Sequence, residues 1–158
     1  MQKITPFLWF DGKAEEAMNF YTSVFKNSKK GTVSYWGEGT PYPKGSVMSA
    51  TFELEGMEFF ALNGGPMYKF TPAISMYVNC ETQEEVDNLW NNLIADGGKE
   101  SMCGWLVDKY GMSWQIIPSA LTKLMHDKDA EKSKRVVQAM MKMNKIIIQD
   151  LQDAYDGK

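Results

Sequence analysis

Two cysteines and one histidine are the residues of this sequence best suited to nucleophilic or metal chemistry. A reactive thiolate needs a neighbouring base or positive charge, and nothing in the sequence brings His126 close to Cys103. The sequence therefore favours Cys103 as a small packed side chain over a Cys–His nucleophile, and predicts that Cys80 is packed as well. Because the two cysteines form no C-x-x-C pair, a reduced, cytoplasmic protein is expected.

Two further motifs resemble catalytic or phosphate-binding sequences only superficially. The run Asn63-Gly64-Gly65-Pro66 lacks the Lys-Ser/Thr ending of a phosphate loop and opens no helix. We interpret it as a turn from which Asn63 can reach a site. The pairs Glu15-Glu16 and Glu84-Glu85 lie where helices are predicted to begin, and the helix dipole favours acidic residues there. The glycine- and proline-rich connection 36–46 has the length of a lid but equally suits plain surface.

Composition excludes several classes of function. Of the 158 residues, 17 are Lys or Arg and 20 are Asp or Glu, which gives a net charge of −3. This balance predicts no nucleic-acid partner, and we interpret the basic bias of 132–145 as a solvated helix face. No apolar run approaches the roughly 20 residues of a membrane helix. The N-terminal apolar stretch ends at Asp11 without a signal-peptide cleavage site, so neither membrane attachment nor secretion is expected.

The chain contains a repeat of one element pattern. Runs beginning at Thr5-Pro6 and Thr71-Pro72 each lead into an amphipathic helix, predicted over 13–25 and 82–96. Three short strands are predicted after each helix, over 31–36, 47–54 and 57–63, and over 99–103, 105–109 and 112–117. We predict one paired domain over 1–118, with modules 1–66 and 67–118. A helical tail over 119–158 follows, with Ser119 as its N-cap.

Strand alternation groups candidate side chains on common faces. Ser113 and Gln115 share one face of the last strand, and Trp114 lies on the other. Ser75 and Tyr77 likewise share a face, as do Phe7 and Trp9. Polar and aromatic groups of this kind suit a pocket for a small, partly aromatic molecule; the alternative is a filled core with Gln115 bonded to backbone.

The repeated order β-α-β-β-β resembles the vicinal oxygen chelate superfamily of glyoxalase I, bleomycin-resistance proteins and extradiol dioxygenases. Four stretches are similar to its PhnB-like group, often labelled 3-demethylubiquinone-9 3-methyltransferase domain: Phe10-Asp11-Gly12, 61–66, 103–106, and Asp108-Lys109-Tyr110-Gly111 with Ser113-Trp114-Gln115. We take the resemblance to extend through the tail. It implies an α+β fold of two βαβββ modules whose mixed sheets curl around a cavity, often completed in a homodimer.

The resemblance also implies where metal ligands would lie. Superfamily enzymes place His or Glu on the first and last strands of each module. The corresponding positions here fall near Thr5, Phe60, Ala73 and Gln115, and only the neutral Gln115 amide offers a ligand atom. We therefore expect neither a metal nor another cofactor.

The leading hypothesis is a metal-independent protein that binds a small hydrophobic or aromatic molecule. Its expected ligand-binding residues are Phe7, Trp9, Phe60, Asn63, Ser75, Tyr77, Cys103, Trp105, Ser113 and Gln115. The alternatives are a metal-dependent lyase, isomerase or dioxygenase of the same fold, the methyltransferase of the family label, and an interaction module acting through its tail. No glycine loop typical of common methyl-donor folds is present.

Overall fold

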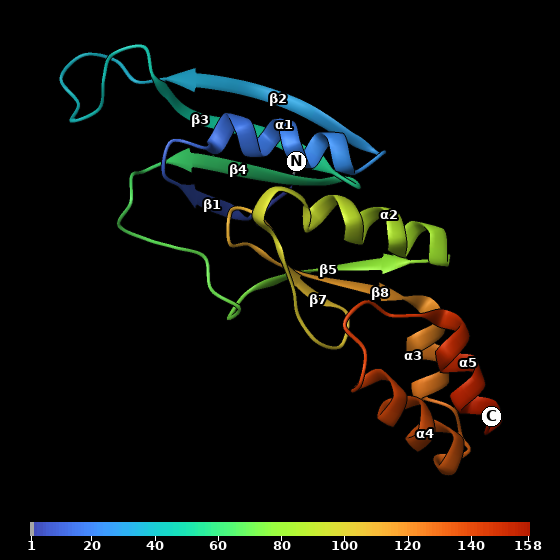
Figure 1. The fold of residues 1–158 in the computed structure, drawn as a ribbon. Helices are drawn as coiled ribbons and strands as arrows, with labels where there is room; N and C mark the ends of the chain where they lie inside the picture. The colour runs from blue at the N-terminus through green and yellow to red at the C-terminus, as the bar shows by residue number, and fades with distance from the viewer. Residues whose placement is uncertain (1) are drawn as a thin grey trace. The chain divides into compact units, whose positions relative to one another are not determined.

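The computed structural model describes residues 2–158 and divides into two compact units. One unit ends at Phe70, and the other runs from Thr71 to Lys158. Figure 1 shows the first unit in blue to green and the second in green to red. Each unit is built around one four-stranded sheet.

The first unit consists of β1 (Phe7–Phe10), α1 (Ala14–Val24), β2 (Ser28–Tyr35), β3 (Val47–Leu54) and β4 (Met57–Asn63). Its strand order is β1-β4-β3-β2, with β1 parallel to β4 and the other pairs antiparallel. Helix α1 lies along one face of this sheet (Figure 1). The apolar side of this amphipathic helix is buried and consists of Ala14, Ala17, Met18, Tyr21 and the following Phe25.

The second unit repeats this topology with β5 (Ser75–Cys80), α2 (Gln83–Leu93), β6 (Lys99–Glu100), β7 (Trp105–Val107) and β8 (Ser113–Pro118). A short 3-10 helix, η1 (Ala95–Gly97), follows α2. The strand order is β5-β8-β7-β6, and β5 is parallel to β8. The predicted order β-α-β-β-β, present twice, is therefore confirmed. The α+β fold class of two mixed sheets is confirmed with it.

Two side-chain hydrogen bonds fix the start of α2, where Thr82 is the N-cap. The Thr82 hydroxyl accepts the backbone N–H of Glu85 at 3.2 Å. The Glu85 carboxylate reaches back and accepts the backbone N–H of Glu81 at 2.8 Å. Together the two bonds satisfy donors that a helix start otherwise leaves without partners.

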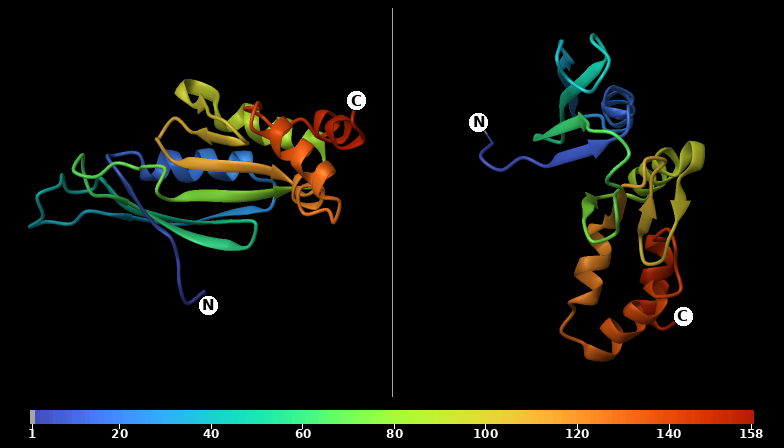
Figure 2. Two further views of the ribbon diagram at one scale, coloured as in Figure 1. Left: turned by 90° about the horizontal axis from the view of Figure 1, so that it is seen from below. Right: turned by 90° about the vertical axis from the view of Figure 1, so that its left-hand side faces the viewer.

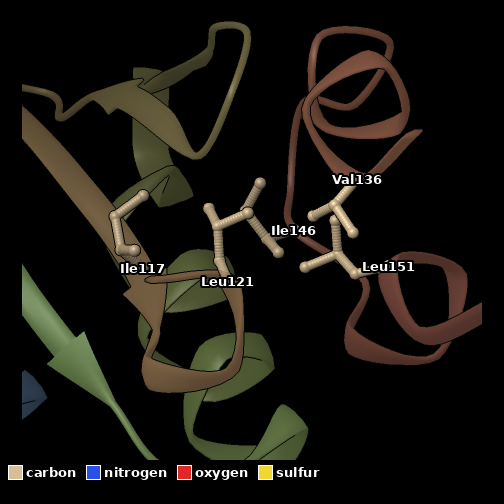
Figure 3. Close-up of a cluster of buried hydrophobic side chains, with 5 residues drawn as sticks. All are labelled: Ile117, Leu121, Val136, Ile146 and Leu151. Atoms are coloured by element: carbon tan, nitrogen blue, oxygen red, sulfur yellow. The ribbon is translucent and has the colours of Figure 1, made fainter. Parts of the chain in front are cut away.

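The tail forms α3 (Ser119–Met125), α4 (Ala130–Met140) and α5 (Ile148–Asp156) and belongs to the second unit. It packs around one hydrophobic cluster, drawn in Figure 3: Ile117, Leu121, Val136, Ile146 and Leu151. Ile117 is the β8 member, so this cluster joins the tail to the sheet. Figure 2 shows the three helices (orange to red) gathered at the end of the second unit.

The basic residues of the tail are partly committed to internal contacts. The Arg135 guanidinium donates to the carbonyls of Ala154 at 2.8 Å and Tyr155 at 2.6 Å. The Lys132 ammonium lies over the Tyr155 ring, 4.8 Å from its centroid. These contacts fasten α4 to the end of α5, where carbonyls lack helical partners.

Two predicted details differ in the structure. Ser119 is the first residue of α3 rather than its cap, because the cap position is Pro118 and the Ser119 hydroxyl donates to Glu81 at 3.0 Å. The strand predicted over 99–103 ends at Glu100, because Cys103 and Gly104 turn the chain with positive φ angles of 59° and 82°.

No helix among residues 2–158 is both long enough and apolar enough to cross a bilayer.

Candidate ligand-binding faces

The first sheet has an aromatic face on the side opposite α1. The Cα atoms of Phe7 and Phe60 pair across β1 and β4, and their rings stack with centroids 6.0 Å apart. Phe7 is 61% exposed and Phe60 is 40% exposed. Leu8 and Phe10 point the other way and are buried. The predicted common face of Phe7 and Trp9 therefore carries an exposed aromatic pair.

Trp9 continues this face towards the end of β1. Its indole Nε1 donates to the Gly65 carbonyl at 2.9 Å, and the Tyr68 ring meets it edge-on at 5.0 Å. The Tyr42 hydroxyl donates to the neighbouring Gly64 carbonyl at 2.9 Å, with the Trp36 ring stacked on Tyr42 at 4.2 Å. The connection 36–46 is thus held against the glycine turn by an aromatic pair and a hydrogen bond.

Asn63 does not belong to the aromatic face. It is 8% exposed. Its Oδ1 accepts the Ala14 backbone N–H at 2.9 Å, and its Nδ2 donates to the Val47 carbonyl at 3.1 Å. Both ends of the amide are therefore used to fix the start of α1 and the start of β3. These bonds give Asn63 a structural role, and its expected role in ligand binding stays a prediction.

The second sheet has a polar and aromatic face on the side away from α2. Gln115 pairs in register with Tyr77 on β5 and with Trp105 on β7. Its Nε2 donates to the Ser75 hydroxyl at 2.9 Å. Tyr77 is 51% exposed, while Gln115, Ser75 and Trp105 are half-buried. The structure thus brings four expected site residues together on one sheet face.

Ser113 differs from its neighbours on that face. It is 1% exposed, and its hydroxyl has no hydrogen-bond partner among the residues that the structure describes. A buried hydroxyl without a partner costs about 1–3 kcal/mol. Ser113 is therefore a position where a bound group or a water molecule would relieve that cost.

A buried structural pair that sequence reasoning missed joins the turn between β7 and β8 to the opposite face of β8. The buried Asp108 accepts the Trp114 indole N–H through Oδ2, and accepts the backbone N–H groups of Tyr110 and Met112 through Oδ1. The sequence did contain a signal for this role, because Asp108 lies two residues before Tyr110-Gly111 and an aspartate at this spacing often closes a turn with its side chain.

The two cysteines have different surroundings. Cys80 is fully buried, and burial, followed by the carboxylates of Glu85 and Glu81, raises the pKa of its thiol to about 12. The predicted packing role of Cys80 is confirmed. Cys103 is half-buried in a left-handed backbone conformation. Its neighbour Gly104 is buried, and an added Cβ there would lie 2.7 Å from the Ile117 side chain.

The positions expected for metal ligands contain few donors. The first-strand residues opposite Phe60 and Gln115 are Phe7 and Tyr77, rather than the residues expected near Thr5 and Ala73. The Gln115 amide is already bonded to Ser75. Within residues 2–158 no three His, Cys, Asp or Glu side chains gather in a way that could hold a metal ion.

Comparison with solved structures defines the class of the fold. A fosfomycin resistance protein, FosX, from Listeria monocytogenes matches with a TM-score of 0.50 and 14% identity, covering 72% of this chain and 89% of that one. A protein of Pseudomonas aeruginosa, PA1353, matches with a TM-score of 0.61 and 22% identity, covering 75% and 98%. The paired modules have the vicinal oxygen chelate fold.

The sequence profile of the 3-demethylubiquinone-9 3-methyltransferase family matches residues 2–117, and the chain belongs to this PhnB-like family. A PhnB protein from Bacillus cereus is 46% identical, with a TM-score of 0.68, over 75% of this chain and all of that one. No protein with a curated function is significantly similar in sequence.

The family profile does not reach the helical tail. It ends at residue 117, and the whole of the Bacillus cereus chain is matched by three quarters of this one. That the family resemblance extends through residues 119–158 stays a prediction.

Proposed function

We propose that the protein binds a small hydrophobic or aromatic molecule on the open faces of its sheets, without a metal or another cofactor. The observation that carries the proposal is the exposure of aromatic rings on the strand faces opposite α1 and α2, beside hydrogen-bonding side chains. Burying one such ring in a complex contributes about 1.5–3 kcal/mol. The Gln115–Ser75 pair would orient a polar group of the ligand.

Phe60 and Met57 provide a matched test on one strand. Phe60 is 40% exposed on the aromatic face, whereas Met57 is 39% exposed and alternates to the other face of β4. We expect Phe60→Ala to weaken the binding of aromatic fragments, measured by native mass spectrometry and thermal shift. Met57→Ala is expected to leave binding unchanged. Equal effects of the two substitutions would contradict binding on the aromatic face.

Metal independence has its own test. Gln115 is neutral and bonded to Ser75, and Phe60 offers no ligand atom, so these positions provide a poor site for a divalent cation. Protein purified without chelators is expected to hold well below one equivalent of zinc, nickel, iron or manganese. Stoichiometric metal that survives dialysis, with ligand binding or activity lost on chelation, would favour a metal-dependent enzyme of this fold instead.

The family description supports a second candidate, methyl transfer to a demethylated ubiquinone. Such a quinone is an aromatic-sized, mostly apolar molecule and suits the same faces. Each sheet, however, has a single parallel pair, β1 with β4 or β5 with β8, beside antiparallel strands. Residues 2–158 contain no G-x-G-x-x-G loop between a strand and a helix, of the kind that common methyl-donor folds use. Calorimetric titration with S-adenosylmethionine separates the candidates, since measurable affinity would favour methyl transfer.

A further inference from the structure

We propose that the tail segment Met143–Ile148 positions the Cys103-Gly104-Trp105 turn, and with it Trp105 on the open face of the second sheet. The inference rests on the proposed function for its effect on ligand binding. Its structural part concerns only contacts within the second unit. The positioning groups come from residues beyond 117, where the family profile ends.

The tail contacts the turn through two consecutive carbonyls. The Met143 carbonyl accepts the Cys103 backbone N–H at 2.7 Å, and the Asn144 carbonyl accepts that of Gly104 at 2.8 Å. Both donors belong to residues with positive φ, a region that a cysteine seldom adopts. The carbonyls therefore stabilise a backbone conformation that the turn by itself does not favour.

The turn also packs tightly between β8 and the tail. A Cβ added to Gly104 would lie 3.1 Å from the Ile116 carbonyl oxygen and 3.2 Å from Cγ1 of Ile146. The Gly104 carbonyl in turn accepts the Ile116 backbone N–H at 2.8 Å. Displacing Ile146 would remove one of the two surfaces that enclose the turn.

The far side of the segment is fastened to α2 and β6. The Gln83 amide donates to the Ile146 carbonyl at 3.1 Å and accepts the Ile148 backbone N–H at 2.8 Å. Lys145 forms an ion pair with Asp87 at 2.7 Å. The Asn144 side chain adds a 3.3 Å bond to the Glu100 carboxylate. The segment is thus held on both sides, and the turn is held by the segment.

Trp105 is the residue through which this arrangement reaches the open face. It follows Gly104 directly, its backbone N–H donates to Met102 at 3.1 Å, and its Cα pairs with Gln115. A shift of the turn therefore moves Trp105 relative to Gln115 and Ser75. Gln83 and Lys145 are, on this basis, positioning residues for the ligand-binding face.

The test removes the side-chain contacts that hold the segment Met143–Ile148 in the 158-residue chain, and it monitors the conformation of the turn directly. Gln83→Met keeps the side-chain length and removes both bonds to the segment, and Lys145→Met removes the ion pair. Gln149→Met is the matched control, because Gln149 is exposed and its amide donates to Asp153 at 3.0 Å within α5, away from the segment. Thermal melting of each variant establishes that it is folded.

The rate at which the Cys103 thiol is labelled reports how tightly the turn is held. Cys80 is fully buried, so Ellman's reagent is expected to label only Cys103 in the native protein. Losing two hydrogen bonds should raise the rate of this labelling about tenfold in Gln83→Met. Amide hydrogen exchange of Cys103 and Gly104 should accelerate in parallel. Unchanged rates of labelling and exchange in both Gln83→Met and Lys145→Met would overturn the proposal.

Binding of anilinonaphthalene sulfonate, followed by fluorescence, tests the consequence. We expect weaker binding in Gln83→Met than in wild type, and no change in Gln149→Met; Tyr77→Ser confirms that the probe binds this face. A loosened turn with unchanged affinity would overturn the link to the ligand while leaving the proposed function intact. If the wild-type protein does not bind anilinonaphthalene sulfonate, ligand binding on the second sheet is contradicted. The rates of thiol labelling and amide exchange then decide by themselves whether the tail positions the turn.

Discussion

The indole Nε1 of Trp114 donates a 2.9 Å hydrogen bond to Oδ2 of Asp108, and both side chains are almost completely buried. The other carboxylate oxygen accepts the backbone N–H groups of Tyr110 and Met112. One acidic side chain therefore closes the turn between β7 and β8 and orients the aromatic ring that packs on the α2 side. The neighbouring Gln115 points to the opposite face and has no part in this network.

Truncation of Trp114 should be strongly destabilising. We expect Trp114→Ala to lower the free energy of unfolding by about 3–5 kcal/mol, because it leaves a cavity under α2. Trp114→Phe keeps most of the volume and leaves Asp108 Oδ2 without its indole donor, at a cost of about 1–3 kcal/mol. Denaturant melts measure both. A loss below about 1 kcal/mol for Trp114→Ala would contradict the burial of this ring.

Gln115→Leu should have a small effect on stability. The side chain is half-buried and its observed side-chain hydrogen bond is to the Ser75 hydroxyl, which water can satisfy after the substitution. We expect the free energy of unfolding to change by less than about 1 kcal/mol and ligand binding to weaken by the 0.5–1.5 kcal/mol of about one hydrogen bond. A Gln115→Leu protein as unstable as Trp114→Ala would mean that the Gln115 face is a filled core.

The faces of the sheets were predictable because alternation is a local property. Trp114 and Gln115 follow the alternation on β8, as do Phe7 and Leu8 on β1. The same rule places Asn63 on the face of β4 opposite to Phe60, because three positions separate the two residues on one strand. Its burial beside α1 agrees with this alternation.

Other features depend on contacts distant in sequence and were not predictable. The strand expected over 99–103 is interrupted because Cys103 and Gly104 donate to carbonyls of the tail some 40 residues further on, at Met143 and Asn144. Local propensity contains no information about such partners. The hydrogen bond from the Ser119 hydroxyl to Glu81 was unpredictable for the same reason, because it depends on where β8 ends relative to α2.

We expect the protein to form a homodimer at micromolar concentration. Phe7, Tyr77 and Phe60 are exposed on open sheet faces, and water contact with apolar rings of this size is unfavourable. Light scattering coupled to size-exclusion chromatography should give twice the 18.0 kDa mass of one chain. A mass near 18.0 kDa across the micromolar range would contradict this expectation.

The ion pair that fastens the tail should make the effect of Lys145→Met depend on pH. Hydrogen bonds from Lys145 and then Gln83 lower the pKa of Asp87 below its usual 3.8. Because the folded-state pKa is below that of the unfolded chain, the stabilisation is fully present above about pH 3.8 and is lost as the pH falls through the folded-state pKa.

At pH 7 we expect Lys145→Met to lower the free energy of unfolding by about 0.2–1 kcal/mol, the range of a partly exposed ion pair. This difference from wild type should shrink towards zero as Asp87 becomes protonated in both proteins. Urea melts of the two proteins between pH 7 and pH 3 measure the trend. Asp87→Asn provides the control background, since only the weaker charge interaction of Lys145 with Glu100 remains there and the effect of Lys145→Met should vary much less with pH. An undiminished difference between wild type and Lys145→Met at the lowest pH would show that Lys145 stabilises the tail by packing rather than by its charge.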